Sequence, residues 1–489
     1  MTTLSAATLP ILARSLAVPS YERTSLTAGV VHVGVGGFHR AHQAMYLDRL
    51  LATGVTDWAV VGVGVLPDDV RMRDALGGQD HLYTLVEKHP DGGRVARVVG
   101  SIVEVLWAPE DVEAVVERMA LATTRVVSLT ITEGGYGLDP VTGGFAPTPE
   151  MLQDLAGSGP LSTVFAIITD ALARRRARGI GPFTIMSCDN IQGNGAVARR
   201  AFTSFARLRD EDLGTWIEEN VSFPSSMVDR ITPATTDADR AAVAESFGVE
   251  DRWPVVCEPF VQWVLEDDFC AGRPELERVG VQLVPDVHPY ELMKLRLLNA
   301  GHQALAYLGF LLGYDYVHEA ARDPHLVALL RRYWAEEARA TLAPVPGVDL
   351  DAYTETLLER FGNPHVADTL TRICADTSDR IPVFLLPVVR DNLAAGGSVH
   401  LAALVVASWT RYAEGIDEQG SPITVIDPLR ADLMPAAARH VDDPLAFLRV
   451  RAVFGDLVDD ARFTAPYAAA LTSLRTHGSR ATLASLLPR

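Results

Sequence analysis

The chain has 489 residues, of which 48% are hydrophobic, and its formal net charge is −19. This length exceeds what one hydrophobic core usually supports, so we expect two domains. The excess of acidic residues argues against a nucleic-acid ligand, because a phosphate backbone is bound by clustered Lys and Arg.

The cysteines and the N-terminus indicate the compartment. The four cysteines are scattered, without the Cys-x-x-Cys spacing of a zinc site or the pattern of a disulfide framework. The N-terminus lacks the basic region and apolar core of a signal peptide. No apolar run reaches the roughly 18 residues of a membrane span. We therefore predict a cytoplasmic protein that binds no membrane.

The first predicted strand ends in a glycine-rich turn. Residues 30–38 read VVHVGVGGF, a β-branched run that leads through glycines into a helix start. This is the context of a dinucleotide-binding fingerprint, in which Gly34 permits the tight turn and Gly36 lets the backbone approach a pyrophosphate. Gly37 and Phe38 complete the predicted cofactor loop. His39 stands where the usual third glycine would be, so the motif departs from the pattern.

A second strand, residues 58–65, is followed by Asp68 and Asp69. A carboxylate just after this strand can accept hydrogen bonds from the ribose diol of NAD and repel the extra phosphate of NADP. The pattern thus favours NAD as the cofactor. The alternative interpretation is a solvated turn that carries two carboxylates.

Strand and helix patterns alternate through the first half of the chain, which is typical of a doubly wound parallel sheet. Polar loops follow two of the strands, at residues 131–136 and 187–190, where such sheets bind ligands. Asn190 either presents its amide there or closes an Asx-turn. The further strands are predicted at residues 83–87, 94–98, 126–131 and 183–188, and helices at residues 109–121 and 163–176.

From about Pro289 onward the pattern changes to long helical periods. We predict an α/β protein, with a Rossmann-type parallel-sheet domain over residues 1–285 and a mostly α-helical, substrate-binding and catalytic domain over residues 286–489. The predicted helices after the first lie at residues 324–342, 350–361, 381–394 and 400–412.

Residues 289–310 predict one helix that begins at a proline, a residue favoured in the first helical turn. At roughly 100° per residue, Glu291, Lys294, Asn299 and His302 fall within an arc of about 140°. Burial among leucines lowers the pKa of a lysine toward the range where it accepts a proton near neutral pH. The face is therefore either catalytic or an ordinary solvated face of an amphipathic helix.

Other polar residues have plainer interpretations. Asp229 with Arg230 is typical of a surface pair, and arginines 372 and 380 flank a polar loop between helices. The pair His39 and His42 lacks a third ligand at a believable spacing, so we predict no metal site.

Several long motifs, in this order, make the chain resemble the polyol-specific long-chain dehydrogenase/reductase family, and most closely its mannitol enzymes. The resemblance covers nearly the whole chain. It rests on residues 34–43 (GVGGFHRAHQ), 128–136 (SLTITEGGY), 186–190 (MSCDN), 227–233 (MVDRITP) and 256–267 (VCEPFVQWVLED), and on the helix with Lys294, Asn299 and His302.

The resemblance implies metal-independent, NAD-dependent oxidation of a polyol to a ketose, here D-mannitol to D-fructose, and the reverse reduction. Lys294 would be the general base, and Asn190 and Asn299 the amides that steady the reacting oxygen. Roles in binding or orienting the polyol would fall to His302, Asp229, Arg372 and Arg380. We add the hypothesis that Glu291, which shares the helix face, relays the proton to solvent.

One departure keeps alternatives open, because the family's mannitol enzymes typically have lysine where this chain has Arg380. D-arabinitol, sorbitol, or the sugar acids mannonate and altronate remain alternative substrates. A non-enzymatic dinucleotide-binding sensor would need the glycine loop but not the Lys294 set. The expected partners are a small polyol or ketose, with no nucleic acid, and the chain is expected to be a monomer or weak homo-oligomer.

Overall fold

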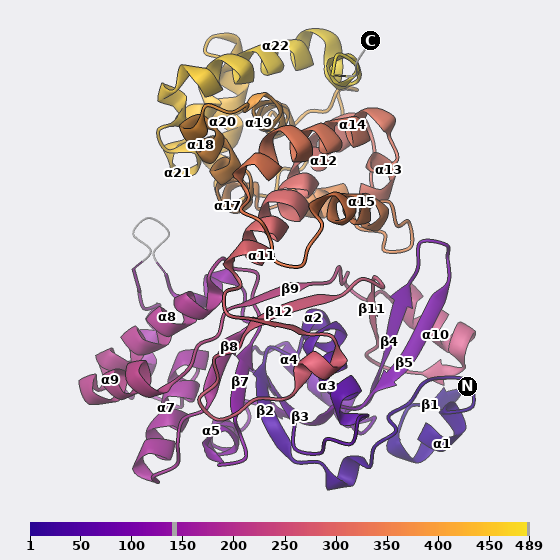
Figure 1. The fold of residues 1–489 in the computed structure, drawn as a ribbon, viewed down its shortest axis with the longest axis vertical. Helices are drawn as coiled ribbons and strands as arrows, with labels where there is room; N and C mark the ends of the chain where they lie inside the picture. The colour runs from indigo at the N-terminus through magenta and orange to yellow at the C-terminus, as the bar shows by residue number, and fades with distance from the viewer. Residues whose placement is uncertain (139–143, 487–489) are drawn as a thin grey trace. The chain divides into compact units, whose positions relative to one another are not determined.

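The computed structural model describes residues 1–138 and 144–486. The chain divides into two compact units, Met1–His288 (unit 1) and Pro289–Arg489 (unit 2) (Figure 1). Each is described by itself below.

Unit 1 is built on a parallel sheet. Among the described residues this sheet has five strands in the order β6-β3-β2-β7-β8, and every neighbouring pair is parallel. The order reverses beside the central β2, which places a topological switch point between β2 and β7. The predicted Rossmann-type fold is confirmed. The strands are β2 (Ala28–Val33), β3 (Ala59–Gly64), β6 (Ile102–Trp107), β7 (Val126–Leu129) and β8 (Thr184–Ser187).

Helices cover both faces of this sheet (Figure 1). Side chains alternate between the faces of a strand, so odd-numbered valines such as Val31 and Val127 pack with α5, α7 and α8. Even-numbered valines such as Val30 and Val126 pack with α3 and α4. The helices are α1 (Leu9–Leu12), α2 (Gly37–Ala41), α3 (Gln43–Leu51), α4 (Asp69–Gly77), α5 (Val112–Ala120), α6 (Pro149–Leu155), α7 (Val164–Ala177), α8 (Asn194–Arg209), α9 (Glu211–Asn220) and α10 (Asp237–Phe247).

Two of the predicted strands lie outside the parallel sheet. β4 (Tyr83–Lys88) and β5 (Arg94–Val99) form an antiparallel hairpin, to which β11 (Val255–Cys257) adds in parallel with β4. The connection between them is closed by a hydrogen bond from His89 N–H to Gly93 O (2.8 Å). A parallel neighbour would need a crossover of a dozen or more residues, which this short loop does not provide.

Further short strands were not predicted. β9 (Ser226–Asp229), β12 (Gln262–Glu266) and β13 (Gln282–Val284) form a mixed sheet in the order β13-β12-β9, and β1 (Thr2–Thr3) pairs with β10 (Val249–Glu250). Strands of two to five residues carry too little periodicity to be distinguished from loops in the sequence.

Unit 2 is helical in its described residues, and its centre is α12, which is buried along nearly its whole length. This helix packs against α13, α14, α16 and α19, and α19 packs against α22 (Figure 1). The helices are α11 (His288–Met293), α12 (Ala300–Leu311), α13 (Val317–Ala320), α14 (Pro324–Arg332), α15 (Leu350–Phe361), α16 (Leu370–Cys374), α17 (Thr377–Phe384), α18 (Leu386–Ala395), α19 (His400–Ala413), α20 (Arg430–Ala438), α21 (Arg451–Phe454) and α22 (Ala461–Ala484).

Two predicted helices of unit 2 are interrupted. The segment 381–394 spans the end of α17 and most of α18, which separate at Leu385 because Pro387 cannot donate to the preceding turn. The segment 324–342 is α14 followed by a π-helical turn, η6 (Tyr333–Ala338), and a short 3-10 turn, η7 (Arg339–Thr341). The helices predicted at residues 350–361 and 400–412 are confirmed.

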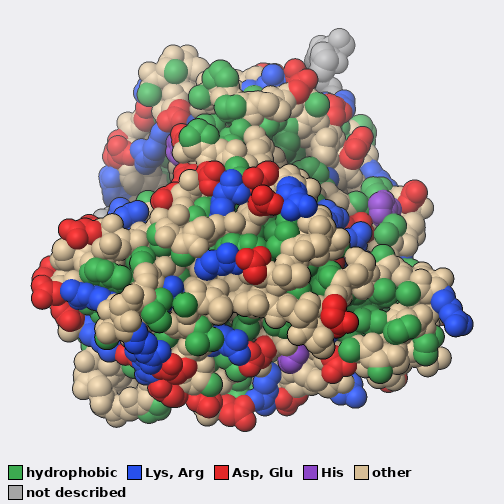
Figure 2. Space-filling view, turned by 60° about the horizontal axis from the view of Figure 1, so that its bottom comes forward, with side chains coloured by type: hydrophobic (Ala, Val, Ile, Leu, Met, Phe, Trp, Pro, Cys, Tyr) green, Lys and Arg blue, Asp and Glu red, His purple; other side chains and the backbone are tan. Residues whose placement is uncertain are grey.

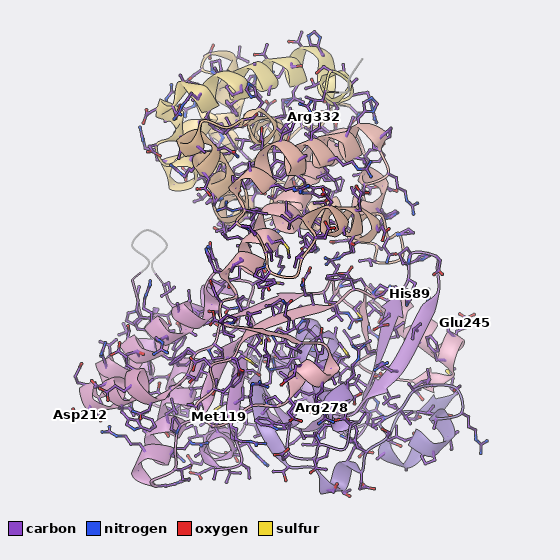
Figure 3. All side chains as sticks on the ribbon, in the orientation of Figure 1. His89, Met119, Asp212, Glu245, Arg278 and Arg332 are labelled. Carbon is purple, nitrogen blue, oxygen red and sulfur yellow. The ribbon has the colours of Figure 1, made fainter. Side chains whose placement is uncertain are left out.

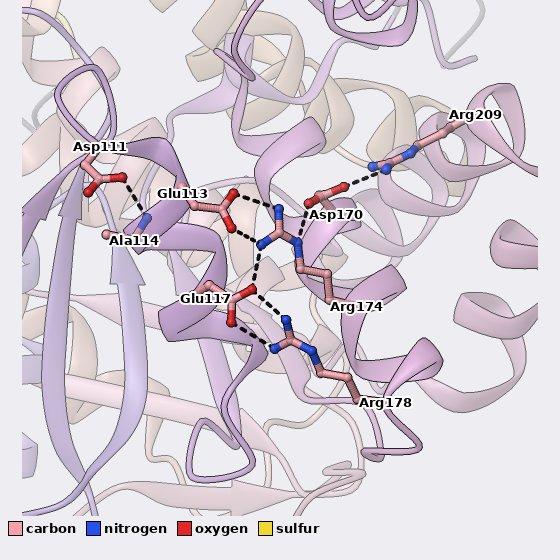
Figure 4. Close-up of polar contacts among 8 residues, drawn as sticks. All are labelled: Asp111, Glu113, Ala114, Glu117, Asp170, Arg174, Arg178 and Arg209. Carbon is pink, nitrogen blue, oxygen red and sulfur yellow. Dashed lines mark hydrogen bonds and ion pairs between the residues drawn. The ribbon is translucent and has the colours of Figure 1, made fainter.

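Charged side chains of both signs are interspersed on the face shown in Figure 2. An ion-pair cluster joins α5 to α7: Arg174 bonds Glu113, Glu117 and Asp170, and Arg178 bonds Glu117 at 2.7 Å (Figure 4). Within residues 1–138 and 144–486, no helix is both long and apolar enough to cross a membrane.

Candidate functional site

The glycine loop after β2 needs glycine at its first position. Gly34 has φ +96°, and a Cβ there would overlap the carbonyl oxygen of Thr130 in the loop after β7. The Gly34 carbonyl accepts hydrogen bonds from Thr130 Oγ1 (2.7 Å) and lies 3.1 Å from His32 Nε2. Gly36 caps α2, and a Cβ there would meet nothing closer than 3.9 Å, so its backbone is open to a ligand. This part of the loop fits a dinucleotide.

The missing third glycine is replaced by a packed histidine. The ring of His39 stacks on that of His32 in β2, with centroids 3.5 Å apart. His32 Nδ1 lies 2.8 Å from Ser128 Oγ, which donates to Gln43 Oε1 (3.0 Å). Burial lowers the pKa of His32 to about 3 and that of His39 well below its ordinary value. The neutral, stacked rings of His32 and His39 support the glycine loop.

The two carboxylates after β3 have different surroundings. Asp69 Oδ2 accepts the backbone N–H groups of Val65 and Leu66, both at 2.9 Å, so its carboxylate is held at the end of β3. Asp68 is exposed and pairs with Arg71 at 3.0 Å. Asp69 is therefore the better-positioned acid for a ribose, whereas Asp68 resembles an ordinary surface residue.

The loops after β7 and β8 are tied together by Asp189, a residue that sequence reasoning did not select. Its carboxylate accepts the N–H of Ile131 (3.2 Å) and of Thr132 (2.8 Å) and the hydroxyl of Tyr136 (2.7 Å). Thr132 has φ +66° and ψ 165°, a backbone conformation that is costly for a β-branched residue. Asn190, next to Asp189, is exposed.

Asp229 is the last residue of β9 and is 4% exposed. It lies opposite Gln262 in the antiparallel pair with β12. The following Arg230 is fully buried rather than on the surface, and it donates to Glu258 O, Ala41 O and Glu87 Oε1. Arg230 thus fixes the end of the strand that carries Asp229.

In unit 2 the predicted catalytic helix is not a regular α-helix. Lys294–Asn299 form a π-helical turn, η5, between α11 and α12, in which Ala300 N–H donates to Leu295 O five residues earlier. The helix predicted over residues 289–310 is present as the unbroken succession of α11, η5 and α12, but the α-helical spacing assumed for it fails at the π turn. At α-helical spacing Lys294 and Asn299 stand at the two edges of the predicted arc, about 140° apart. The wider turn brings residues five apart onto one side, and such turns are frequent at functional sites.

The polar residues of this helix are buried. The exposed fractions are 7% for Lys294 and 9% for Asn299, and Glu291 and His302 are equally enclosed. Asn299 Nδ2 is buried and has no hydrogen-bond partner among the described residues. An amide donor in that state is suited to a substrate oxygen, since an unsatisfied buried donor is otherwise costly.

The ring of His302 is held by Phe361, the last residue of α15, with centroids 4.1 Å apart and planes inclined by 27°. Phe361 carried no signal in the sequence beyond its place at a helix end. The stack fixes the plane of the imidazole, which a residue that orients a substrate hydroxyl requires.

Arg372 and Arg380 lie on neighbouring helices, α16 and α17. Arg372 is half-exposed and forms a bidentate ion pair with Asp368. Arg380 Nη1 donates to the carbonyls of Arg372 (3.1 Å) and Ile373 (3.2 Å). Arg380 therefore caps the end of α16, a structural contact in addition to any contact with substrate.

The two units thus offer different chemistry. Unit 1 has a backbone loop and a carboxylate that fit a dinucleotide, and unit 2 has a buried amine, amide and imidazole suited to proton transfer and oxygen binding. Within residues 1–138 and 144–486, no group of three or more His, Cys, Asp or Glu residues is arranged to hold a metal ion.

Comparison with known proteins places both units in one family. Residues 28–278 match the mannitol dehydrogenase Rossmann domain, and residues 286–475 match the mannitol dehydrogenase C-terminal domain. The mannitol 2-dehydrogenase of Phaeosphaeria nodorum is 48% identical over 96% of this chain and 83% of its own length. That of Aspergillus fumigatus is 45% identical over 95% of this chain and 94% of its own.

Solved structures agree along the whole chain. The ternary complex of Pseudomonas fluorescens mannitol 2-dehydrogenase with NAD and D-mannitol has a TM-score of 0.91 and 45% identity, with 99% of each chain covered. A D-sorbitol dehydrogenase in its substrate-free form has a TM-score of 0.90 and 36% identity, covering 98% of this chain and 100% of its own. This chain belongs to the mannitol dehydrogenase family.

Proposed function

We propose that this protein oxidises D-mannitol to D-fructose with NAD, and catalyses the reverse reduction, with Lys294 as the general base and without a metal ion. NAD-dependent polyol oxidation is the activity of the family. The choice of D-mannitol as the substrate is supported by the mannitol 2-dehydrogenase relatives at 45–48% identity. The observation that carries it is the buried π turn with Lys294 at its start and Asn299 at its end.

NAD is supported by the residues of unit 1. The open backbone at Gly36, the left-handed turn at Gly34 and the fixed carboxylate of Asp69 fit a pyrophosphate and a ribose diol. Bound NAD supplies the acceptor for the hydride that leaves the carbinol carbon.

Lys294 accepts the proton of the hydroxyl on that same carbon. The side chain must lose its own proton first, which lysine can do and arginine cannot. Only two of the 43 Lys and Arg residues of this chain are lysine, Lys88 and Lys294. Lys88 pairs with Asp239 at 2.7 Å, and every other positively charged side chain of the sequence apart from Lys294 is an arginine. A lysine at position 294 therefore supports a role in proton transfer rather than in charge.

The amides and the imidazole handle the oxygen atoms. The Asn299 Nδ2–H group donates to the reacting oxygen as negative charge develops on it, and Asn190 is the second amide of this kind. His302 holds a neighbouring hydroxyl. Asp229, Arg372 and Arg380 bind the rest of the polyol, and Glu291 passes the proton from Lys294 toward solvent.

A second candidate substrate is sorbitol, because a D-sorbitol dehydrogenase is 36% identical and matches the fold with a TM-score of 0.90. The sugar acids gain no support from Arg380. Its Nη1 donates to two backbone carbonyls, and an arginine there agrees with the scarcity of lysine in this chain.

The test is a panel of initial rates of NAD reduction with D-mannitol, sorbitol, D-arabinitol, D-mannonate and D-altronate, in the presence of a chelator. We expect D-mannitol to have the highest kcat/KM. Lys294→Ala should lower kcat by about 10²–10⁴-fold, the range for loss of a general base. Lys294→Arg, which keeps the charge, should be as inactive as the alanine variant.

Each part of the proposal can be contradicted separately. Full activity of Lys294→Arg would show that Lys294 is not the general base, and loss of activity on chelation would show that a metal ion is needed. A higher kcat/KM for another substrate would show that D-mannitol is not the preferred polyol. In Glu291→Gln, an unchanged pH profile of kcat would remove the proton relay.

A further inference from the structure

In its described part, residues 289–486, unit 2 contains two π-helical turns that contact each other, η5 (Lys294–Asn299) and η6 (Tyr333–Ala338). In the second turn, Arg339 N–H donates to Trp334 O five residues earlier. π turns are rare, so two in contact within one domain point to a shared purpose. The first carries the proposed base and amide, and the second follows Arg332, the last residue of α14 (Figure 3).

Side chains of the second turn donate to backbone carbonyls of the first. Trp334 Nε1–H donates to Leu297 O at 2.9 Å, and the hydroxyl of Tyr333 donates to Arg296 O at 3.2 Å. Both donors are buried, with exposed fractions of 2% and 0%. Burial raises the pKa of Tyr333 well above its ordinary value of 10, so its hydroxyl remains a donor.

The second turn is itself fixed from the opposite side. The carboxylate of Glu337 accepts the N–H groups of Leu401 and Ala402, both at 2.8 Å, and so caps the start of α19. Asn392 Nδ2 donates to Glu337 O at 3.0 Å. Trp334 and Tyr333 are therefore anchored on a rigid segment and not on a free surface loop.

The contact with the indole leaves little room for a side chain on the first turn of α12. A Cβ at Gly301 would lie 3.1 Å from Trp334 Cζ2 and 3.2 Å from Nε1. The ring of Trp334 also lies 6.5 Å from that of Phe361, which stacks on His302. The indole thus borders the segment that carries Asn299 and the ring that holds His302.

We propose that Trp334, assisted by Tyr333, is a positioning residue that keeps the Lys294–Asn299 segment in its widened turn. This inference rests on the proposed function, because it assigns Lys294 and Asn299 to the reaction. The physical reason is register: a return to regular α-helical hydrogen bonding would rotate Lys294 relative to Asn299 by about one residue step of 100°. The donated hydrogen bonds to Arg296 O and Leu297 O oppose that return.

The test uses three variants, Trp334→Phe, Tyr333→Phe and the double variant of these two. The control is Trp409→Phe. Trp409 is an equally buried tryptophan of unit 2 that packs among Phe447 and Phe454. We expect kcat for the polyol to fall about tenfold to a hundredfold in Trp334→Phe, as for small misplacements of catalytic groups. The KM for NAD should stay within about twofold, since uniform binding is not affected. Tyr333→Phe should show a smaller fall and Trp409→Phe almost none.

A second readout does not depend on activity. Because the chain has only two lysines, 13C-lysine incorporated during expression gives resonances from Lys88 and Lys294 alone. The Lys294 resonance and its titration should change in Trp334→Phe, while that of Lys88, in unit 1, should not. Hydrogen exchange over residues 294–300 should become faster in the same variant and not in Trp409→Phe.

A Lys294 resonance, an exchange rate and a kcat that match Trp409→Phe would overturn the proposal. If Trp334→Phe does not fold, Tyr333→Phe, which removes one oxygen atom, decides the same question. If the unaltered protein oxidises none of the polyols, the proposed function fails, and the resonance and exchange measurements still decide whether Trp334 holds the turn.

Discussion

The two units support their functional residues in different ways. In unit 1 the proposed cofactor residues lie in loops at the carboxyl ends of parallel strands, and at Gly34 and Gly36 it is the backbone that is proposed to meet the cofactor. In unit 2 the proposed catalytic residues lie on a buried helix whose hydrogen bonding changes to the i→i+5 pattern at Lys294. Both depend on residues distant in sequence: the glycine loop lies against the backbone and hydroxyl of Thr130, whereas the proposed catalytic turn accepts hydrogen bonds from the side chains of Tyr333 and Trp334.

The two units also differ in where their charged side chains find hydrogen-bond partners. Asp69 is satisfied by two backbone N–H groups four and three residues away. Arg296, inside the π turn η5, is buried, and it reaches Thr341 O at 2.7 Å and Asp391 at 2.7 Å, both from later segments of unit 2. A buried charge without such partners would be expensive. The helix that carries Arg296 is therefore stable only within the folded unit 2.

The largest effect expected from a single change in unit 2 outside Lys294 is that of Asn299→Ala. Its buried Nδ2 has no partner among the described residues, so its contribution should appear only when the substrate oxygen is present. We expect kcat to fall about 10²–10³-fold, as for loss of an oxyanion donor. Stability measured by thermal unfolding should change little. A normal kcat in this variant would place the donor elsewhere.

In unit 1 the matching change is Gly34→Ala, with Gly54→Ala as its control. The two glycines have φ of +96° and +97°, but a Cβ at Gly54 would meet nothing within 4 Å, whereas one at Gly34 would overlap Thr130 O. The left-handed conformation alone costs about 1–2 kcal/mol. Gly34→Ala should cost clearly more in urea unfolding and should weaken NADH binding. Equal costs in the two variants would show that the close approach to Thr130 is unimportant.

A smaller effect is expected from Asp69→Ala, measured as the ratio of kcat/KM for NAD and NADP. Removal of the fixed carboxylate should shift this ratio toward NADP by about tenfold or more, since like charges placed side by side cost several kcal/mol. Asp68→Ala should leave the ratio nearly unchanged, because Asp68 is exposed and pairs with Arg71. A larger shift of the ratio in Asp68→Ala than in Asp69→Ala would show that Asp68, and not Asp69, selects NAD over NADP.

The smallest effect concerns the ion pairs between α5 and α7. Hydrogen bonds from Arg178 and Arg174 lower the pKa of Glu117 from 4.5 to about 2. Because the folded-state pKa lies below the ordinary value, this carboxylate stabilises the fold above about pH 4.5, and the contribution is lost as pH falls toward 2.

Glu117→Gln should therefore lower the melting temperature slightly at pH 7, because exposed pairs contribute little. The difference from the unaltered protein should vanish in acid. Glu245→Gln, at an exposed glutamate on α10 (Figure 3), is the control for the substitution itself. A difference that persists at low pH would assign the effect to packing and not to charge.

Strands and helices were predicted correctly from the sequence where the local residue pattern determines them. The β-branched strand before Gly34, the alternation of strands with helices, and the helices at residues 350–361 and 400–412 are all confirmed. It failed where partners decide: β4 and β5 have the pattern of strands but pair with each other, and residues 324–342 end in π and 3-10 turns. Asp189 went unselected because its three donors come from another loop.

The amino-acid sequence by itself determined the fold class, the glycine loop and the set of side chains on the helix after Pro289, because hydrophobic period, glycine placement and residue chemistry are local properties. Only the tertiary structure decided that Lys294 and Asn299 share a widened turn, that Trp334 and Tyr333 donate to it, and that Arg380 caps α16. Those contacts join residues tens of positions apart, and their hydrogen bonds form only once the helices of unit 2 have packed.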